Sequence, residues 1–148
     1  MQIQRIQTLY ILLAIAAVVA FIFIPFGFWD ATVQASGVKL VELSGKMTAL
    51  LIPACVAILV MFISIFSYKK FPLQKGLVGL SMLIVVAMML LVIYVMTMGF
   101  EVLVPDVTVK PIWAGGGLLL VAALVALIAA LSRIKADQKL LRSYDRLR

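Results

Sequence analysis

The chain has 148 residues, of which 66% are hydrophobic and 13% charged, and it carries a formal net charge of +7 with no histidine and one cysteine. Because soluble domains are about half apolar, this composition excludes a soluble globular protein. One cysteine without histidine cannot build zinc, copper, haem or iron–sulfur sites or a histidine-assisted nucleophile, so we expect no metal, no cofactor and no catalytic site.

Four apolar runs dominate the sequence, and none contains Asp, Glu, Lys, Arg or His. They cover residues 6–28, 48–67, 76–98 and 112–132. A helix rises about 1.5 Å per residue, so each run can cross a hydrocarbon core of roughly 30 Å while satisfying its own backbone hydrogen bonds. The sequence therefore predicts an all-α membrane protein, an antiparallel bundle of four transmembrane helices in a single domain over residues 1–148, with a tail at 133–148.

The first run follows Arg5 and resembles the start of a signal peptide. It is longer than the roughly 7 to 15 residues of a signal-peptide core, and no small-residue cleavage site follows, so we expect it to remain as a helix. The run reaches Pro25, after which Phe26, Phe28 and Trp29 are typical of an aromatic belt at the membrane interface. We therefore expect Trp29 to contact lipid or a partner.

The connection between the first two runs has the pattern of a β-hairpin. Ser36-Gly37 separates two stretches of partly alternating apolar and polar residues, and glycine at such a turn favours a hairpin. The third connection, from Glu101 to Val109, also has an extended character, and Pro105 would confine it to a sheet edge. We expect these connections to form a small extracytoplasmic cap that is β-hairpin-like, with two or three strands.

The second and third runs are predicted to be antiparallel neighbours, because only the short turn from Tyr68 to Lys75 joins them. The third run is rich in methionine, a residue that suits irregular helix packing. A copper(I) site is the alternative interpretation of these methionines, but no His or Cys accompanies them in the run. We therefore expect them to serve packing.

The fourth run begins with Trp113, a second candidate contact for lipid or a partner, and continues with the triplet Gly115-Gly116-Gly117. The triplet is not a phosphate-binding loop, because no strand is expected before it and no Gly-Lys-Ser/Thr follows. Small residues then recur at helical spacing and predict a close contact with another helix. These residues are Ala122, Ala126 and Ala129 or Ala130.

Lys and Arg are unevenly distributed between the two sides of the predicted bundle. The side with both termini and the middle turn would carry ten Lys and Arg against two Asp, and the other side three Lys against four acidic residues. By the positive-inside rule, both termini are expected in the cytoplasm and the cap outside. Because the charge follows topology, we expect membrane lipids as partners and no nucleic acid.

The two polar ends of the chain hold the remaining candidate contacts. Arg5 would pair with Asp137 or Asp145 and so join the first helix to the last. Arg142 and Arg146 belong to the same tail segment, which is expected to continue as a helix. This segment would lie along the inner leaflet or dock on a partner protein.

The opening Gln-Arg-Ile-Gln-Thr-Leu-Tyr at residues 4–10 and the closing residues 137–148 resemble the two ends of an uncharacterised family. That family is the small four-span inner-membrane proteins of Bacteroidota known as domain of unknown function 4293. The resemblance implies a multi-pass protein of the bacterial cytoplasmic membrane. It implies no established activity, and it adds no catalytic residues.

The charge-free runs offer packing surfaces and almost no chemistry, so we expect no enzyme. The first expected function is a non-enzymatic accessory or organising subunit of a larger inner-membrane complex, in secretion, respiration or envelope assembly. The alternative is a protein that binds or transports a lipid or another hydrophobic small molecule in a cavity beneath the cap. Catalysis by loop carboxylates such as Asp30 and Asp106 is set aside, because these residues are typical of solvated loops.

Overall fold

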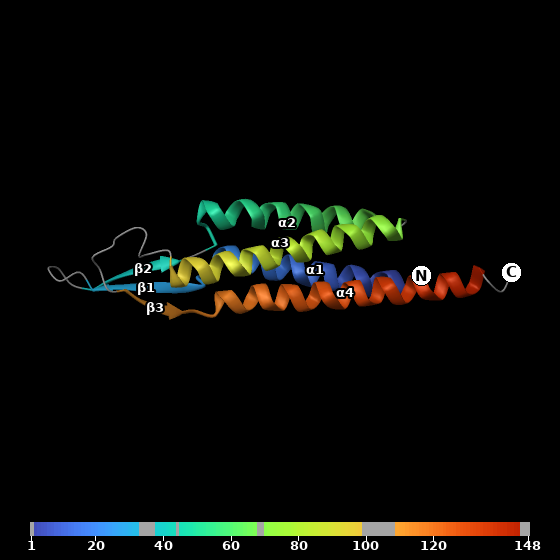
Figure 1. Cartoon of the computed structure of the whole chain (residues 1–148). Coiled ribbons are helices and arrows are strands. Elements are labelled where there is room, and N and C mark those ends of the chain that lie inside the picture. Colours follow the sequence, from blue (N-terminus) through green and yellow to red (C-terminus); the bar gives the residue numbers. More distant parts are fainter. Residues whose placement is uncertain (1, 33–37, 44, 68–69, 99–108, 146–148) are drawn as a thin grey trace.

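The fold is a bundle of four long helices with a small sheet at one end (Figure 1). The computed structural model describes residues 2–32, 38–43, 45–67, 70–98 and 109–145. The helices are α1 (Gln2–Phe23), α2 (Thr48–Phe66), α3 (Phe71–Thr97) and α4 (Gly116–Asp145), and the strands are β1 (Gly27–Thr32), β2 (Val38–Leu43) and β3 (Val109–Trp113). We call the end with the strands the sheet end, and the opposite end, where α1 begins and α4 ends, the termini end.

Buried residues recur along every helix at spacings of three or four, except that Ala126 and Leu127 on α4 are adjacent. On α1 they are Gln7, Ile11, Ala14, Val18 and Phe21, and on α2 they are Leu50, Ala54, Ala57, Met61 and Ser64. On α3 they are Gln74, Val78, Ser81, Val85, Met88, Val92 and Met96, and on α4 they are Leu120, Ala123, Ala126, Leu127, Ala130 and Ile134. This heptad-like repeat is typical of helices that pack side by side in a left-handed bundle.

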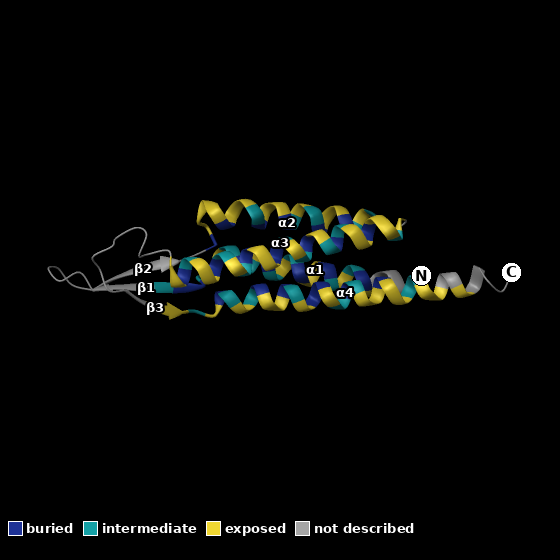
Figure 2. Cartoon of the chain, in the orientation of Figure 1, coloured by how far each residue is buried: buried dark blue, intermediate teal, exposed yellow. Residues whose placement is uncertain are grey.

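The residues between these core positions are also apolar, but they face outward. Leu9, Phe62 and Leu83 are each more than half exposed, and Figure 2 shows exposed residues along all four helices. A soluble bundle would carry polar residues at such positions. All four helices are long and apolar enough to cross a membrane, so the outward surface of the bundle suits lipid.

The small sheet is antiparallel and has the strand order β2-β1-β3. The central strand β1 begins at Gly27, which pairs with Leu43 on one side and with Trp113 on the other. The predicted hairpin is thus confirmed, because β1 and β2 form an antiparallel pair. Its expected turn at Ser36-Gly37 lies outside the described residues, and its position outside the cytoplasm stays a prediction.

The end of α1 is joined to the beginning of α4 by main-chain contacts that continue the β1–β3 pairing. The Ala114 N–H donates to the Phe26 carbonyl at 3.0 Å, and the Gly116 N–H donates to the Pro25 carbonyl at 3.2 Å. A Cβ atom on Gly116 would lie 2.4 Å from the Pro25 carbonyl oxygen, so only glycine allows this approach. This junction sets the geometry of the sheet end.

The boundaries of the first helix differ from those expected. α1 ends at Phe23 instead of residue 28, because Pro25 lacks the N–H that would continue the helix. The aromatic segment from Phe28 onward is part of β1 and not an extension of the first run. Hydropathy alone does not separate α1 from β1, because the residues on both sides of Pro25 are apolar.

The third and fourth helices also begin at other residues than expected. α3 starts at Phe71, with Pro72 in its first turn, where proline is well tolerated. α4 starts at Gly116 and not at Ile112, because Ile112 belongs to β3. A strand therefore does precede the glycine triplet. Of the extended segment expected in the third connection, residues 101–108 lie outside the described part of the chain.

Candidate functional site

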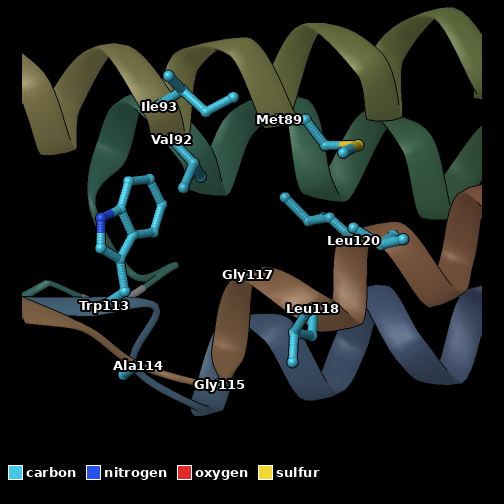
Figure 3. A pocket seen from close by; sticks show the side chains of 10 residues that line it. Met89, Val92, Ile93, Trp113, Ala114, Gly115, Gly117, Leu118 and Leu120 are labelled. Carbon is cyan, nitrogen blue, oxygen red and sulfur yellow. The ribbon is translucent and has the colours of Figure 1, made fainter.

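A pocket lies at the sheet end of the bundle, between α3 and α4 and next to β3 (Figure 3). Its volume of about 470 Å³ falls within the range of roughly 300–1,000 Å³ that is usual for small-molecule sites. Its walls are Met89, Val92 and Ile93 from α3 and Gly117, Leu118, Leu120 and Val121 from α4, closed by Trp113, Ala114 and Gly115. None of these lining residues is charged, so the pocket suits an apolar guest.

Two glycines line this pocket and have open space beside them. A Cβ atom at Gly115 or at Gly117 would meet no atom within 4 Å, and both residues line the pocket. Gly116 between them differs, because it packs against Pro25. The triplet therefore has two roles, a close backbone contact at its centre and free volume on either side.

Trp113 closes the pocket toward the sheet. Its indole extends from β3 toward Val92 and Ile93 of α3 (Figure 3). On the outward side, Ile93 is 47% exposed and Leu118 is 71% exposed, so the pocket opens on the surface that suits lipid. Whether Trp113 contacts a ligand stays a prediction, but the structure places it on a wall that a guest would touch.

Four polar side chains at the termini end form what we call the polar layer. Gln7, Ser64 and Gln74 are buried in the core, and Asp137 beside them is partly exposed. Gln7 and Gln74 are 2% exposed and Ser64 is 0% exposed. The Gln7 side-chain Nε2 donates a hydrogen bond to Asp137 Oδ2 and so links α1 to α4. Arg133 lies one turn before Asp137 on the same helix.

The structure does not decide the pair that the sequence predicted between Arg5 and Asp137 or Asp145. Arg5, Arg142 and Asp145 lie in helices, but their side chains are outside the described part, as is all of Arg146. Within the described part, the α1 residue that forms a hydrogen bond with Asp137 is Gln7, which was not among the residues predicted from the sequence. Its signal in the sequence was an amide side chain within the first apolar run.

Trp29, the other aromatic candidate, lies in the central strand of the sheet. Its backbone pairs with Val41 of β2 and with Pro111 of β3. Proline fits β3, because β3 is an edge strand of the described sheet and needs fewer backbone donors. The Trp29 side chain lies outside the described part, so its predicted interface contact stays a prediction.

The small-residue face of α4 is displaced from the one expected. Ala126 and Ala130 are buried as predicted, but Ala122 is exposed and its neighbour Ala123 takes the core position. The heptad-like spacing explains this shift, because Ala123 is in register with Leu120 and Leu127. The buried alanines let α4 pack closely within the bundle.

The methionines of α3 lie in different environments. Met88 and Met96 are buried in the core, and Met89 lines the pocket. Among the described residues, no three His, Cys, Asp or Glu side chains lie together. The residues that line the pocket are apolar or glycine, so the pocket can hold an apolar group through van der Waals contact.

Comparison with known proteins identifies the sequence family. The model of the family described as Domain of unknown function (DUF4293) matches residues 3–147. No curated protein and no solved structure matches the chain. The matched range includes the pocket and the polar layer, and the family description assigns a function to neither.

Proposed function

Because the chain belongs to the family described as Domain of unknown function (DUF4293), whose function is open, we propose a role from geometry. The protein is a multi-pass membrane protein that binds an apolar molecule, one acyl chain of a membrane lipid, between α3 and α4. The observation that carries this proposal is the apolar pocket of about 470 Å³, which Gly115 and Gly117 line with open space beside them.

The position of the pocket supports a lipid as the guest. The pocket opens on the outward surface, between Ile93 and Leu118, so a chain in the bilayer reaches it without crossing water. The Trp113 indole lies beside the pocket, and Trp side chains are enriched at the membrane interface because they are partly polar and partly apolar. Such a guest gains affinity from apolar contact alone.

The orientation of the protein is part of this proposal. The positive-inside rule places the termini end, with its excess of Lys and Arg, in the cytoplasm. The sheet would then be extracytoplasmic, and the pocket would take its guest from the outer leaflet of the bacterial cytoplasmic membrane. Cysteine-accessibility labelling of Asp145→Cys and Thr32→Cys, each in a Cys55→Ser background, tests this orientation in intact cells.

Binding is tested by the fluorescence of Trp113, which is the only tryptophan left after Trp29→Phe. We expect a lipid with a brominated acyl chain, titrated into the detergent-solubilised full chain, to quench Trp113 with a saturating curve. Gly117→Leu fills the pocket, so it should remove the saturating component. Quenching that never saturates, or that Gly117→Leu leaves unchanged, contradicts the proposal.

Gly79→Leu is the matched control for this experiment. Gly79 is also helical, and a Cβ atom there would meet no atom within 4 Å. It lies on α3 outside the pocket lining, so the same change of side chain adds the same apolar volume elsewhere. The saturating curve should therefore survive Gly79→Leu.

A second candidate function is the non-enzymatic accessory or organising subunit of a larger inner-membrane complex. The observation that favours it is the length of α4, which continues to Asp145 and extends past the start of α1, the end of α2 and the start of α3 (Figure 1). Lys135, Lys139 and Leu140 on this extension are exposed, so a partner could bind there. Cross-linking of native membranes should capture a partner on it, whereas a lone monomer after mild solubilisation counts against this role.

A further inference from the structure

The polar layer at the termini end contains two buried oxygen atoms that have no hydrogen-bond partner among the described residues. They are Ser64 Oγ on α2 and Gln74 Oε1 on α3. Both side chains are almost completely buried, with exposures of 0% and 2%. An oxygen without a partner in an apolar environment is costly, and more so in a bundle surrounded by lipid. Each of these atoms therefore needs a hydrogen-bond partner.

Ser64 differs from the other helical hydroxyls for which a hydrogen bond is described. Those hydroxyls, on Ser67, Ser81, Thr97, Ser132 and Ser143, each donate to a carbonyl of their own helix at 2.7–3.0 Å. Such a local bond is the usual way for a serine to satisfy itself inside an apolar helix. Because Ser64 makes no such bond, its hydroxyl is available to a group outside its own backbone.

Ser64 and Gln74 lie at the same level of the bundle. Ser64 is in the last turn of α2 and Gln74 in the first turn of α3, and the two helices are antiparallel and joined by a short turn. Both occupy core positions of the heptad-like repeat, so both face the interior. On the neighbouring helices, the same end of the core carries the hydrogen bond from Gln7 to Asp137.

We propose that Ser64 and Gln74 hold a buried water molecule, which makes the termini end of the bundle a hydrated site. Gln74 Oε1 can only accept, and the Ser64 hydroxyl can accept or donate, so a water molecule satisfies both atoms at once. A buried water needs two or more polar partners, and this layer supplies them. The next core layer contains Met61 and Val78, so hydration ends there.

Solid-state NMR in lipid bilayers tests this proposal by measuring polarisation transfer from water to side chains of the full-length protein. We expect the Gln74 side-chain amide to receive polarisation from water as quickly as the exposed Ser143 side chain. The Ser81 side chain is buried and bonded to the Leu77 carbonyl, so it should receive little polarisation. Gln74→Leu identifies the signal by its loss. A dry Gln74 amide would overturn the proposal.

Thermal unfolding of the variants provides a second measurement. Ser64→Ala and Gln74→Leu should each lower the melting temperature by about 3–5 °C, and the double variant by less than the sum, since a shared water is lost only once. Ser81→Ala is the control, and its effect should add to that of Gln74→Leu. If Ser64 and Gln74 are coupled but Gln74 is dry, the two side chains bond each other directly and the proposal fails.

Discussion

The two ends of the bundle use opposite chemistry to complete the same heptad-like core. At the sheet end, an apolar pocket lies between α3 and α4, and two glycines with open space beside them line it. At the termini end, the polar layer contains a side-chain bond from α1 to α4 and two buried oxygen atoms that have no partner in the described part of the chain. The helices have almost no polar side chains along their length, and the two features that interrupt the apolar core lie at its ends. These are the apolar pocket at the sheet end and the polar layer at the termini end.

The difference also concerns what holds each end together. Backbone contacts between Pro25 and Gly116 fix the sheet end, whereas a side-chain bond from Gln7 to Asp137 contributes at the termini end. A backbone contact depends on the absence of a Cβ atom, and a side-chain bond depends on the presence of an acceptor. Substitutions at the two ends should therefore fail for different reasons.

The largest effect is expected from Gly116→Ala, which would break the junction of the sheet end. The new Cβ atom would lie 2.4 Å from the Pro25 carbonyl oxygen, so the backbone of α1 or α4 must shift. We expect the free energy of unfolding to fall by about 3 kcal/mol, as in overpacked cores. Equilibrium unfolding in detergent measures this loss, and Gly115→Ala, which meets no atom, is the control.

A smaller effect is expected from Asp137→Leu at the termini end. The substitution leaves the buried Gln7 amide without its acceptor, which should cost about 2 kcal/mol of unfolding free energy. Asp137→Asn keeps an acceptor oxygen and should recover part of that loss. Lys135→Leu, on an exposed position of the same helix, should change stability by no more than about 0.5 kcal/mol. Equal losses in Asp137→Leu and Lys135→Leu would contradict the role of the bond.

The smallest effect on stability is expected from Gly117→Leu, although it should have the largest effect on lipid binding. The leucine side chain enters open space, so the unfolding free energy should stay within about 1 kcal/mol of the original chain. A large loss would show that the pocket does not have room for a side chain. The unfolding measurement thus separates a blocked pocket from a misfolded protein.

The four helices and the hairpin follow from the sequence because hydropathy and turn residues carry enough information. The charge-free runs identify the helices, and glycine in the first connection indicates a turn between strands. Hydropathy could not place the helix boundaries, because the strand residues after Pro25 and around Ile112 are as apolar as the helices next to them. Only the hydrogen-bonded pairing of Gly27 with Trp113 distinguishes strand from helix here.

The buried faces and the pocket were not predictable in the same way. In a membrane protein both faces of a helix are apolar, so polarity does not reveal which face is buried. Leu83 is exposed and Val85 is buried, although both are aliphatic. The pocket depends on which glycine of the triplet meets the backbone of Pro25, and that contact joins residues far apart in the sequence.

The central claim, that the sheet end holds an apolar chain, is tested most directly by anomalous X-ray diffraction. Crystals of the full chain grown with a phospholipid brominated in its acyl chain would locate that chain. We expect a bromine peak in the pocket, between Val92, Trp113 and Gly117, and loss of that peak in Gly117→Leu. Bromine found only around the outer surface of the bundle, with the pocket free of it, would contradict the account.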